Sequence, residues 1–434
     1  MIVRRPFWAV IMILIVAGIA VFVLPSLAAN FPPDSLAIPY RVIFLTVALV
    51  VISWAWAFFS TRGLSFKRVA RGFRQQLGEV LEERFEVGNK FGLARVWLEI
   101  RDQSNLPGAN GSRVFSWLGR REIRTFTSYT LLTQRGEYNL GPTVLYSGDP
   151  FGLFAFQKTF QNPGTILVMP FFVDIGVFPF PPGLLTGGRA IRRKTQETTP
   201  QSAGVREFVW GDPTNRIHWP TTARKDKLMV KEFDEDPQAD VWIFVDAQKD
   251  AHYVAPEAAV TPKVDKFWLW KKKFKFTLPA NTFEYSASVS ASVANYFIKQ
   301  GQAVAFASFG QMYVALPAER GDRQISKILE TLAFLKPEGN LPLLGLINAQ
   351  ISNITRGSVV VMVSSANDTT ISEAAEALVQ HKIKPVVILI DRGSFGASEN
   401  SEGLAMALIH KKIPVAIIHK GDELRNVLER GFLT

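Results

Sequence analysis

Residues Phe7 to Ala28 read FWAVIMILIVAGIAVFVLPSLA, without one charged side chain. About 20 consecutive apolar residues let a helix cross the hydrocarbon core of a bilayer, where only a helix or a closed barrel satisfies its own backbone. A second run, Val42 to Phe59, reads VIFLTVALVVISWAWAFF and ends with aromatic residues suited to an interface. Prolines in the connection predict a break. The sequence therefore predicts a transmembrane helical hairpin over residues 1–60, with helices at about 7–28 and 42–59.

The flanking charges predict the orientation of this hairpin. Arg4 and Arg5 precede the first helix, and a basic juxtamembrane segment, 61–77, follows the second. The connection carries only Asp34 and Arg41. Because cytoplasmic flanks carry the excess of Lys and Arg, we expect both the N- and the C-terminus in the cytoplasm. The alternative is a cleaved signal peptide ending near Ala28, which would still leave the C-terminal bulk inside.

Composition narrows the function classes. The 434 residues include no cysteine, which excludes disulfides, thiolate nucleophiles and cysteine-based metal sites. The histidines are scattered, without the spacing of a helical metal pair. The net charge of +11 gathers beside the apolar runs and at 189–194, where it favours anionic lipid over nucleic acid. We therefore expect the lipid bilayer as a partner and no nucleic acid.

Three further regions of the chain have distinct sequence patterns. Residues 78–165 alternate apolar and polar side chains between turn formers, which predicts a β-sandwich-like domain. A Pro/Gly-rich linker spans 166–205. In 237–434, apolar strand-like runs such as DVWIFVDA and KPVVILID alternate with amphipathic stretches, which predicts an α/β domain with a parallel sheet. The whole is a multi-domain chain.

Two motifs carry a family resemblance. The run RGEYNLGPTVLYSGDPFGLF spans Arg135 to Phe154, and REFVWGDPTNRIHWPTTARKDKLMVKEFDED forms a block at 206–236. Both resemble the bacterial domain-of-unknown-function 58 family. The signature positions are Arg206, Glu207, Gly211, Asp212, Arg216, His218, Trp219 and Arg224. The resemblance implies a von Willebrand factor A-like (Rossmann-type) C-terminal domain and a multi-pass protein of the bacterial inner (cytoplasmic) membrane.

The chemistry of the 206–236 block leaves alternatives open. Arg216, His218 and Arg224 are suited to binding an anion, and with Asp212 they are the candidate residues of a hydrolase or transferase. The structural alternative is an ion-pair network that fixes the segment. The other motif, Arg135 to Phe154, is interpreted as a structural corner. A third alternative is that the block changes conformation and that a partner protein recognises this change. No nucleophile or phosphate-binding glycine loop accompanies the block.

The family resemblance also implies a metal position after the first α/β strand. Its aspartate-x-serine-x-serine pattern reads Asp246-Ala-Gln-Lys-Asp250 here, and Ser364 follows a later strand where an aspartate is expected. Asp246, Asp250 and Ser364 are thus the candidate ligands of a degenerate Mg²⁺ site. Because both serines of the pattern are replaced, we expect no cofactor.

An insertion at about 251–282 interleaves lysines with aromatics. Its Trp268, Trp270, Lys271, Lys272 and Lys273 suit contact with a membrane surface or an acidic partner. This favours a lipid or envelope-stress sensor as one alternative function, and a solvated hairpin is the other interpretation of the insertion.

The main functional hypothesis is a membrane-anchored interaction scaffold facing the cytoplasm. No recognisable catalytic motif occurs, so we expect no enzyme. The family resemblance implies that such proteins act as adaptors for MoxR-type AAA+ ATPases. The sequence leaves the oligomeric state open.

Overall fold

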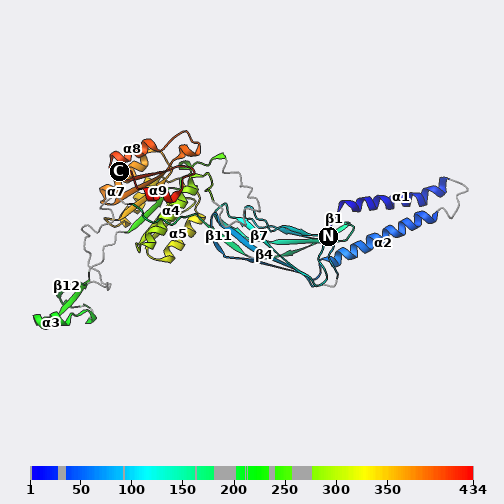
Figure 1. The fold of residues 1–434 in the computed structure, drawn as a ribbon, viewed down its shortest axis with the longest axis horizontal. Coiled ribbons are helices and arrows are strands. Elements are labelled where there is room, and N and C mark those ends of the chain that lie inside the picture. The colour runs from blue at the N-terminus through cyan, green and yellow to red at the C-terminus, as the bar shows by residue number, and fades with distance from the viewer. Residues whose placement is uncertain are drawn as a thin grey trace. The chain divides into compact units, whose positions relative to one another are not determined.

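The computed structural model describes residues 2–27, 36–90, 93–161, 164–179, 202–210, 212, 214–233, 240–256 and 276–433. The chain divides into two compact units, one formed by Met1–Met169 and Thr261–Phe276 and the other by Pro170–Val260 and Thr277–Thr434 (Figure 1). The chain is therefore multi-domain, as predicted.

The first unit begins with two apolar helices, α1 (Arg5–Leu27) and α2 (Ala37–Ser60). Both are long and apolar enough to cross a membrane. The expected start of α2 at Val42 was wrong, because the helix already includes Pro39. Proline is tolerated in a first helical turn, where backbone N–H groups have no intrahelical acceptor.

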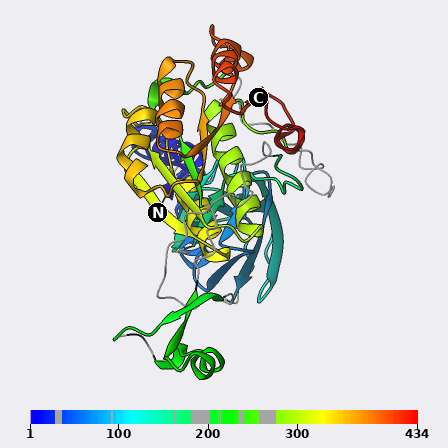
Figure 2. The same cartoon turned by 90° about the vertical axis from the view of Figure 1, so that its left-hand side faces the viewer.

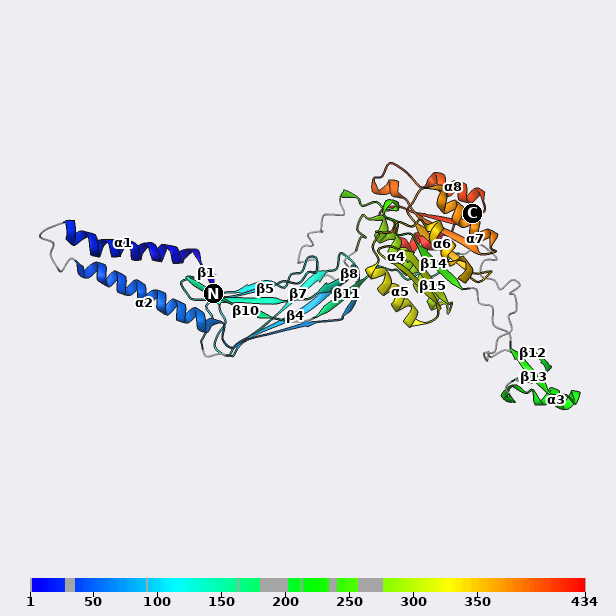
Figure 3. The same ribbon diagram turned by 180° about the vertical axis from the view of Figure 1, so that it is seen from behind.

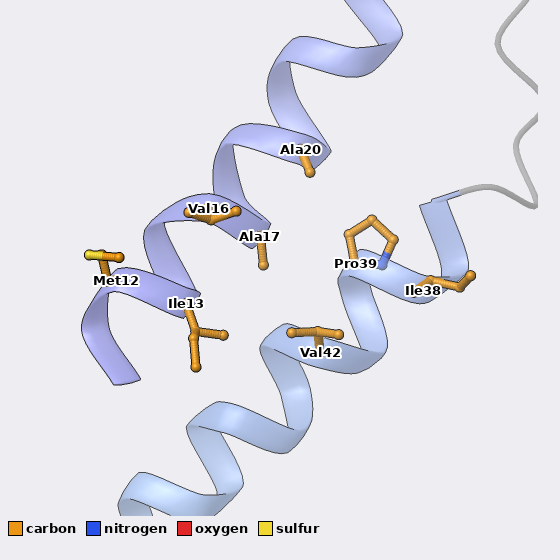
Figure 4. Close-up of a pocket in the computed structure, with 8 residues that line it drawn as sticks. All are labelled: Met12, Ile13, Val16, Ala17, Ala20, Ile38, Pro39 and Val42. Atoms are coloured by element: carbon orange, nitrogen blue, oxygen red, sulfur yellow. The ribbon is translucent and has the colours of Figure 1, made fainter. Parts of the chain in front are cut away.

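The two helices leave a shallow groove between them. Its volume is about 330 Å³. Figure 4 shows the side chains that line it, all of them apolar: Met12, Ile13, Val16, Ala17, Ala20, Ile38, Pro39 and Val42. Such a lining fits a hydrocarbon environment rather than a polar ligand.

The other elements described in the first unit are β-strands. Its strands are β1 (Ile2–Val3), β2 (Leu64–Ala70), β3 (Arg74–Gln76), β4 (Val80–Asn89), β5 (Leu98–Asp102), β6 (Arg113–Phe115), β7 (Ile123–Leu131), β8 (Gly136–Asn139), β9 (Thr143–Gly148), β10 (Phe154–Phe160) and β11 (Thr165–Met169). They form sheets of order β1-β10-β9-β5-β6, β2-β4-β7 and β3-β11-β8.

The core of this unit lies between two of these sheets. Phe85 and Phe126 of the β2-β4-β7 sheet stack at 4.9 Å and share a buried cluster with Leu98 and Leu145 of the β5 and β9 strands. Residues 61–77, expected as a juxtamembrane segment, contribute β2 and β3, and β11 takes the start of the expected 166–205 linker. The sheets therefore extend beyond the expected 78–165 in both directions.

The helical hairpin is attached to the β-structure both before α1 and after α2. Before α1, Ile2 and Val3 pair antiparallel with Ala155 and Phe154 of β10. After α2, buried Arg95 donates from Nη2 to the Arg62 carbonyl at 2.6 Å. The hairpin is thus built into the β-structure rather than joined to it by a linker.

The second unit contains a six-stranded sheet of order β16-β15-β14-β17-β18-β19 (Figure 3). Its strands are β14 (Val241–Val245), β15 (Val304–Phe309), β16 (Tyr313–Glu319), β17 (Val359–Ser364), β18 (Lys384–Ile390) and β19 (Val415–Ile418). All pairs are parallel except β15 with β16. The predicted parallel-strand sheet is confirmed.

Helices cover both faces of this sheet. They are α4 (Thr282–Lys299), α5 (Asp322–Phe334), α6 (Leu343–Gln350), α7 (Thr369–Gln380), α8 (Glu402–His410) and α9 (Leu424–Arg430). Trp242 and Phe244 pack toward α6, α7 and α8, while α4 and α5 lie on the other face. Burial on both faces explains why β14 is apolar throughout.

A smaller element of the second unit holds the signature residues. Strands β12 (Ser202–Glu207) and β13 (Met229–Phe233) pair antiparallel, and helix α3 (Trp219–Lys225) lies between them in the chain (Figure 2). We call the described residues of 202–233 the signature module.

Candidate functional site

The carboxyl edge of the parallel sheet is the first candidate site. The chain leaves β14 toward β15 on one side and later returns to β17 on the other. Open α/β sheets bind ligands where the strand order reverses in this way, outside the carboxyl ends of the strands. Asp246 follows β14 at this point, Ser364 ends β17, and Ser365 follows it.

Asp246 is buried and fully engaged. Its Oδ2 accepts from Ser364 Oγ at 2.5 Å, and its Oδ1 accepts from the backbone N–H of Gln248 at 3.0 Å. Burial raises the pKa of Asp246 to about 6, against the lowering effect of these two hydrogen bonds, while the charge of Asp368 adds to the rise. The carboxyl group is therefore a poorly solvated acid that titrates close to neutral pH.

The proposed ligand set is only partly assembled. Asp246 and Ser364 meet, whereas Asp250 lies exposed in a short 3-10 helix, Lys249–Ala251. Among the described residues, no group of three or more His, Asp or Glu gathers in a metal-binding arrangement. Mg²⁺ needs an octahedral set of oxygens. A single carboxylate with both oxygens already engaged fits such an ion poorly.

A buried hydrogen-bonded group lies beside Asp246 and was not expected. His252 Nε2 lies 2.9 Å from the Asp246 carbonyl oxygen, and its Nδ1 lies 2.9 Å from Ser365 Oγ and 3.2 Å from Thr282 Oγ1. Because a carbonyl only accepts, Nε2 carries the proton in this arrangement. Ser365 donates to the Ala251 carbonyl at 2.6 Å and is fully buried. A buried serine of this kind ties the edge together and offers no nucleophile to a substrate.

A second engaged acid lies two strands away. Asp391 follows β18 and accepts from the N–H groups of Ser394 and Ser401 at 3.0 and 2.9 Å. Its Oδ2 also lies 3.1 Å from His419 Nδ1. Burial alone would raise its pKa, but these backbone groups and His419 together lower the pKa of Asp391. Sequence reasoning missed this pair because its members are 28 positions apart.

The signature module is the second candidate site, and its described residues include two ion pairs. Arg206 makes a two-pronged contact with Asp212, at 2.7 Å from Nη1 to Oδ2 and 2.6 Å from Nη2 to Oδ1. Asp212 also accepts from the Val209 N–H at 2.9 Å. Glu207 pairs with Lys227 at 3.0 Å on the surface. Asp212 therefore closes a turn after β12.

His218 serves the start of α3. Its Nδ1 accepts from the Thr221 N–H at 3.3 Å and lies 2.7 Å from Thr221 Oγ1, the geometry of a helix N-cap. Arg224 is exposed at the other end of α3. The side chain of Arg216 and residue Gly211 lie outside the described residues, as do Trp268, Trp270, Lys271, Lys272 and Lys273.

Among the described residues of the second unit, the most exposed aromatic side chains lie on the signature module. Trp210 is 97% exposed and Trp219 is 65% exposed. Val209, which precedes Trp210 in the chain, and Leu228, which precedes β13, are exposed as well. Exposed tryptophans are typical of binding surfaces.

Solved structures give little guidance. The CARDB domain of the PF1109 protein from Pyrococcus furiosus, in complex with di-metal ions, is 16% identical, with a TM-score of 0.18 over 24% of this chain and 91% of that chain. β-Glucosidase from Listeria innocua in complex with glucose is 12% identical, with a TM-score of 0.15 over 24% of this chain and 16% of that chain. Scores this low support no inference about function.

Sequence comparison is more informative. The uncharacterized protein YeaD of Bacillus subtilis (strain 168) is 25% identical over 231 residues, which are 53% of this chain and 50% of YeaD. This chain thus spans about half the length of that relative. Residues 204–262, which include most of the signature module and β14, match the family model described as protein of unknown function DUF58.

Proposed function

We propose that this chain is a membrane-anchored scaffold that recruits a partner protein through its signature module. The exposure of Trp210 and Trp219 carries the proposal, since large aromatics anchor many protein interfaces. Arg206, Asp212 and His218 are meanwhile engaged in holding the shape of the module.

The proposed topology has both termini in the cytoplasm. The pairing of Ile2 and Val3 with β10 supports it, because the first residues of the chain and the β-structure after α2 must then share one side of the membrane. The same pairing speaks against cleavage near Ala28, which would remove β1. Together with the basic flanks, this favours a multi-pass protein of the bacterial inner membrane facing the cytoplasm.

The partner in this proposal is a MoxR-type AAA+ ATPase, as the family resemblance implies. The order β16-β15-β14-β17-β18-β19, with β16 antiparallel at one edge, supports assigning the second unit to the von Willebrand A-like class. In this proposal the carboxyl edge around Asp246 is a structural part of the adaptor rather than a metal centre.

A hydrolase or transferase built on Asp212, Arg216, His218 and Arg224 is the competing hypothesis. It needs Asp212 and His218 to act on one substrate. Asp212 binds Arg206 and Val209, and His218 caps α3 through Thr221. Both side chains thus have structural tasks in the module, which favours the scaffold.

Affinity capture of the detergent-solubilised full chain from its own cells, with and without ATP, tests the proposal. We expect mass spectrometry to find an AAA+ ATPase whose recovery changes with nucleotide, and whose recovery is lost with W210A/W219A. Trp117, which is 49% exposed in the first unit, supplies the matched control W117A. Equal capture by W210A/W219A would exclude this surface, and absence of an AAA+ ATPase from the wild-type sample would exclude the partner class.

A further inference from the structure

The turn between β9 and β10, Asp149-Pro-Phe-Gly-Leu153, has a defined shape. The buried carboxylate of Asp149 accepts from the backbone N–H groups of Phe151, Leu153 and Phe154, at 2.9, 3.2 and 2.7 Å. Gly152 has a φ of +72°, which favours glycine at this position. Such internal bonding makes the turn a rigid projection.

The strand register gives the direction of this projection. Ile2 lies opposite Ala155 and Val3 opposite Phe154, and the Arg4 N–H donates to the Leu153 carbonyl at 3.0 Å. Moving forward along β1 therefore means moving backward along β10, toward the turn. Since α1 begins at Arg5, the tip of the turn lies on the side toward which α1 leaves the β-structure.

One side of the turn packs directly on the hairpin. Leu153 and Phe154 are buried in a cluster with Ala57 of α2, against which Phe7 and Val10 of α1 also pack. The rings of Phe7 and Phe154 lie 5.2 Å apart. At the same level, the Arg4 guanidinium lies 4.2 Å from the ring centroid of Trp97. Tryptophan with arginine at a helix end is typical of a membrane interface.

Phe151 remains outside this cluster and is 58% exposed at the tip. We infer that the turn is a third membrane contact, with the Phe151 ring inserted into the bilayer at the headgroup boundary beside α1. Continuity with the apolar helices selects the bilayer as the occupant. The inference rests on the proposed membrane anchor, and it gives the Asp-Pro-Phe-Gly-Leu motif a role beyond that of a corner.

The absence of cysteine from the sequence allows a direct test. Three phenylalanine-to-cysteine variants of the full chain, F22C, F151C and F73C, are labelled with an environment-sensitive fluorophore in nanodiscs. Phe22 is 82% exposed on α1, and Phe73 is 71% exposed beyond the far end of β2, whose seven residues extend about 20 Å from the end near α2. Nanodiscs with and without doxyl-labelled lipid are then compared.

We expect quenching by doxyl lipid and blue-shifted emission at positions 22 and 151, and neither effect at position 73. Quenching at 22 with none at 151 overturns the inference and leaves the anchor intact. Equal quenching at 73 and 151 also overturns it, because contact would not be specific to the turn. No quenching at 22 overturns the anchor and the inference together.

Discussion

Arg68 lies 2.7 Å from Glu83 inside the first unit, with 4% and 0% of the two side chains exposed. The same guanidinium reaches Asp102 at 2.9 Å. Burial raises the pKa of Glu83 despite the opposing charge of Arg68. One arginine therefore compensates two carboxylates that have little access to water.

Replacing Arg68 with methionine should leave both acids without this compensation. We expect a loss of about 3–5 kcal/mol in the free energy of unfolding, as is typical when one partner of a buried ion pair is removed. Arg71, whose pair with Glu82 is exposed, supplies the control, and R71M should cost about 1 kcal/mol or less. Denaturant unfolding in detergent measures both, and equal losses would contradict the assignment.

Asp246 should make the stability of the sheet depend on pH. Its pKa of about 6 in the folded chain exceeds the ordinary 3.8, so the folded state favours the protonated acid. The stabilisation is present below about pH 4 and is lost as pH rises through 6. At pH 7.5 we expect the β14 amides to be better protected from hydrogen exchange in D246N than in wild type. The gain in the free energy of opening should be at most about 3 kcal/mol.

The advantage of D246N should shrink at pH 5, where wild-type Asp246 is largely protonated. D250N, at an exposed position, is the control and should change nothing. If D246N instead lost protection at pH 7.5, and Mg²⁺ stabilised only the wild type, the carboxylate would be acting as a metal ligand.

The register of β1 predicts a disulfide in a chain that has none. I2C/A155C places two cysteines at opposite positions of an antiparallel pair, within bonding distance. We expect mild oxidation of membranes that contain this variant to link the peptide with position 2 to the peptide with position 155, as detected by mass spectrometry. I2C/Q157C, two residues out of register, should stay reduced. Failure of the first pair to form would contradict both the strand and the shared side of the membrane.

The Arg206–Asp212 contact should hold the signature module together. R206A removes a two-pronged, partly buried pair, so we expect faster hydrogen exchange across β12 and β13 by roughly 1 kcal/mol, with β14 unchanged. K227A removes only an exposed partner of Glu207 and should have little effect. If R206A and K227A changed hydrogen exchange equally, the two-pronged Arg206–Asp212 contact would have no special role.

Local patterns in the sequence predicted the elements that depend on nearby residues. The length of the apolar runs predicted α1 and α2, and continuous apolar strands between amphipathic stretches predicted the parallel sheet. Strand β16 was missed although it alternates exposed and partly buried residues, because Pro317 argues against a strand; an edge position tolerates it.

Contacts between distant residues could not be predicted in this way. Nothing near Ile2 indicates that it pairs with Ala155, and nothing near His252 indicates that it meets Ser365. The residue types of the signature block were identified, but which of them pair depends on the turn that brings Arg206 to Asp212. Partner choice is set by tertiary geometry rather than by local composition.

The pairing of β1 with β10 also constrains the order in which the sheet can fold. Ile2 and Val3 precede their partners in the chain by both apolar helices and most of the first unit. Until β10 has been made, β1 and β9 both lack the strand that lies between them, and an open edge can pair with another chain. Strand β10 thus completes the sheet last, so a nascent chain released before β10 would expose the unpaired edge of β9.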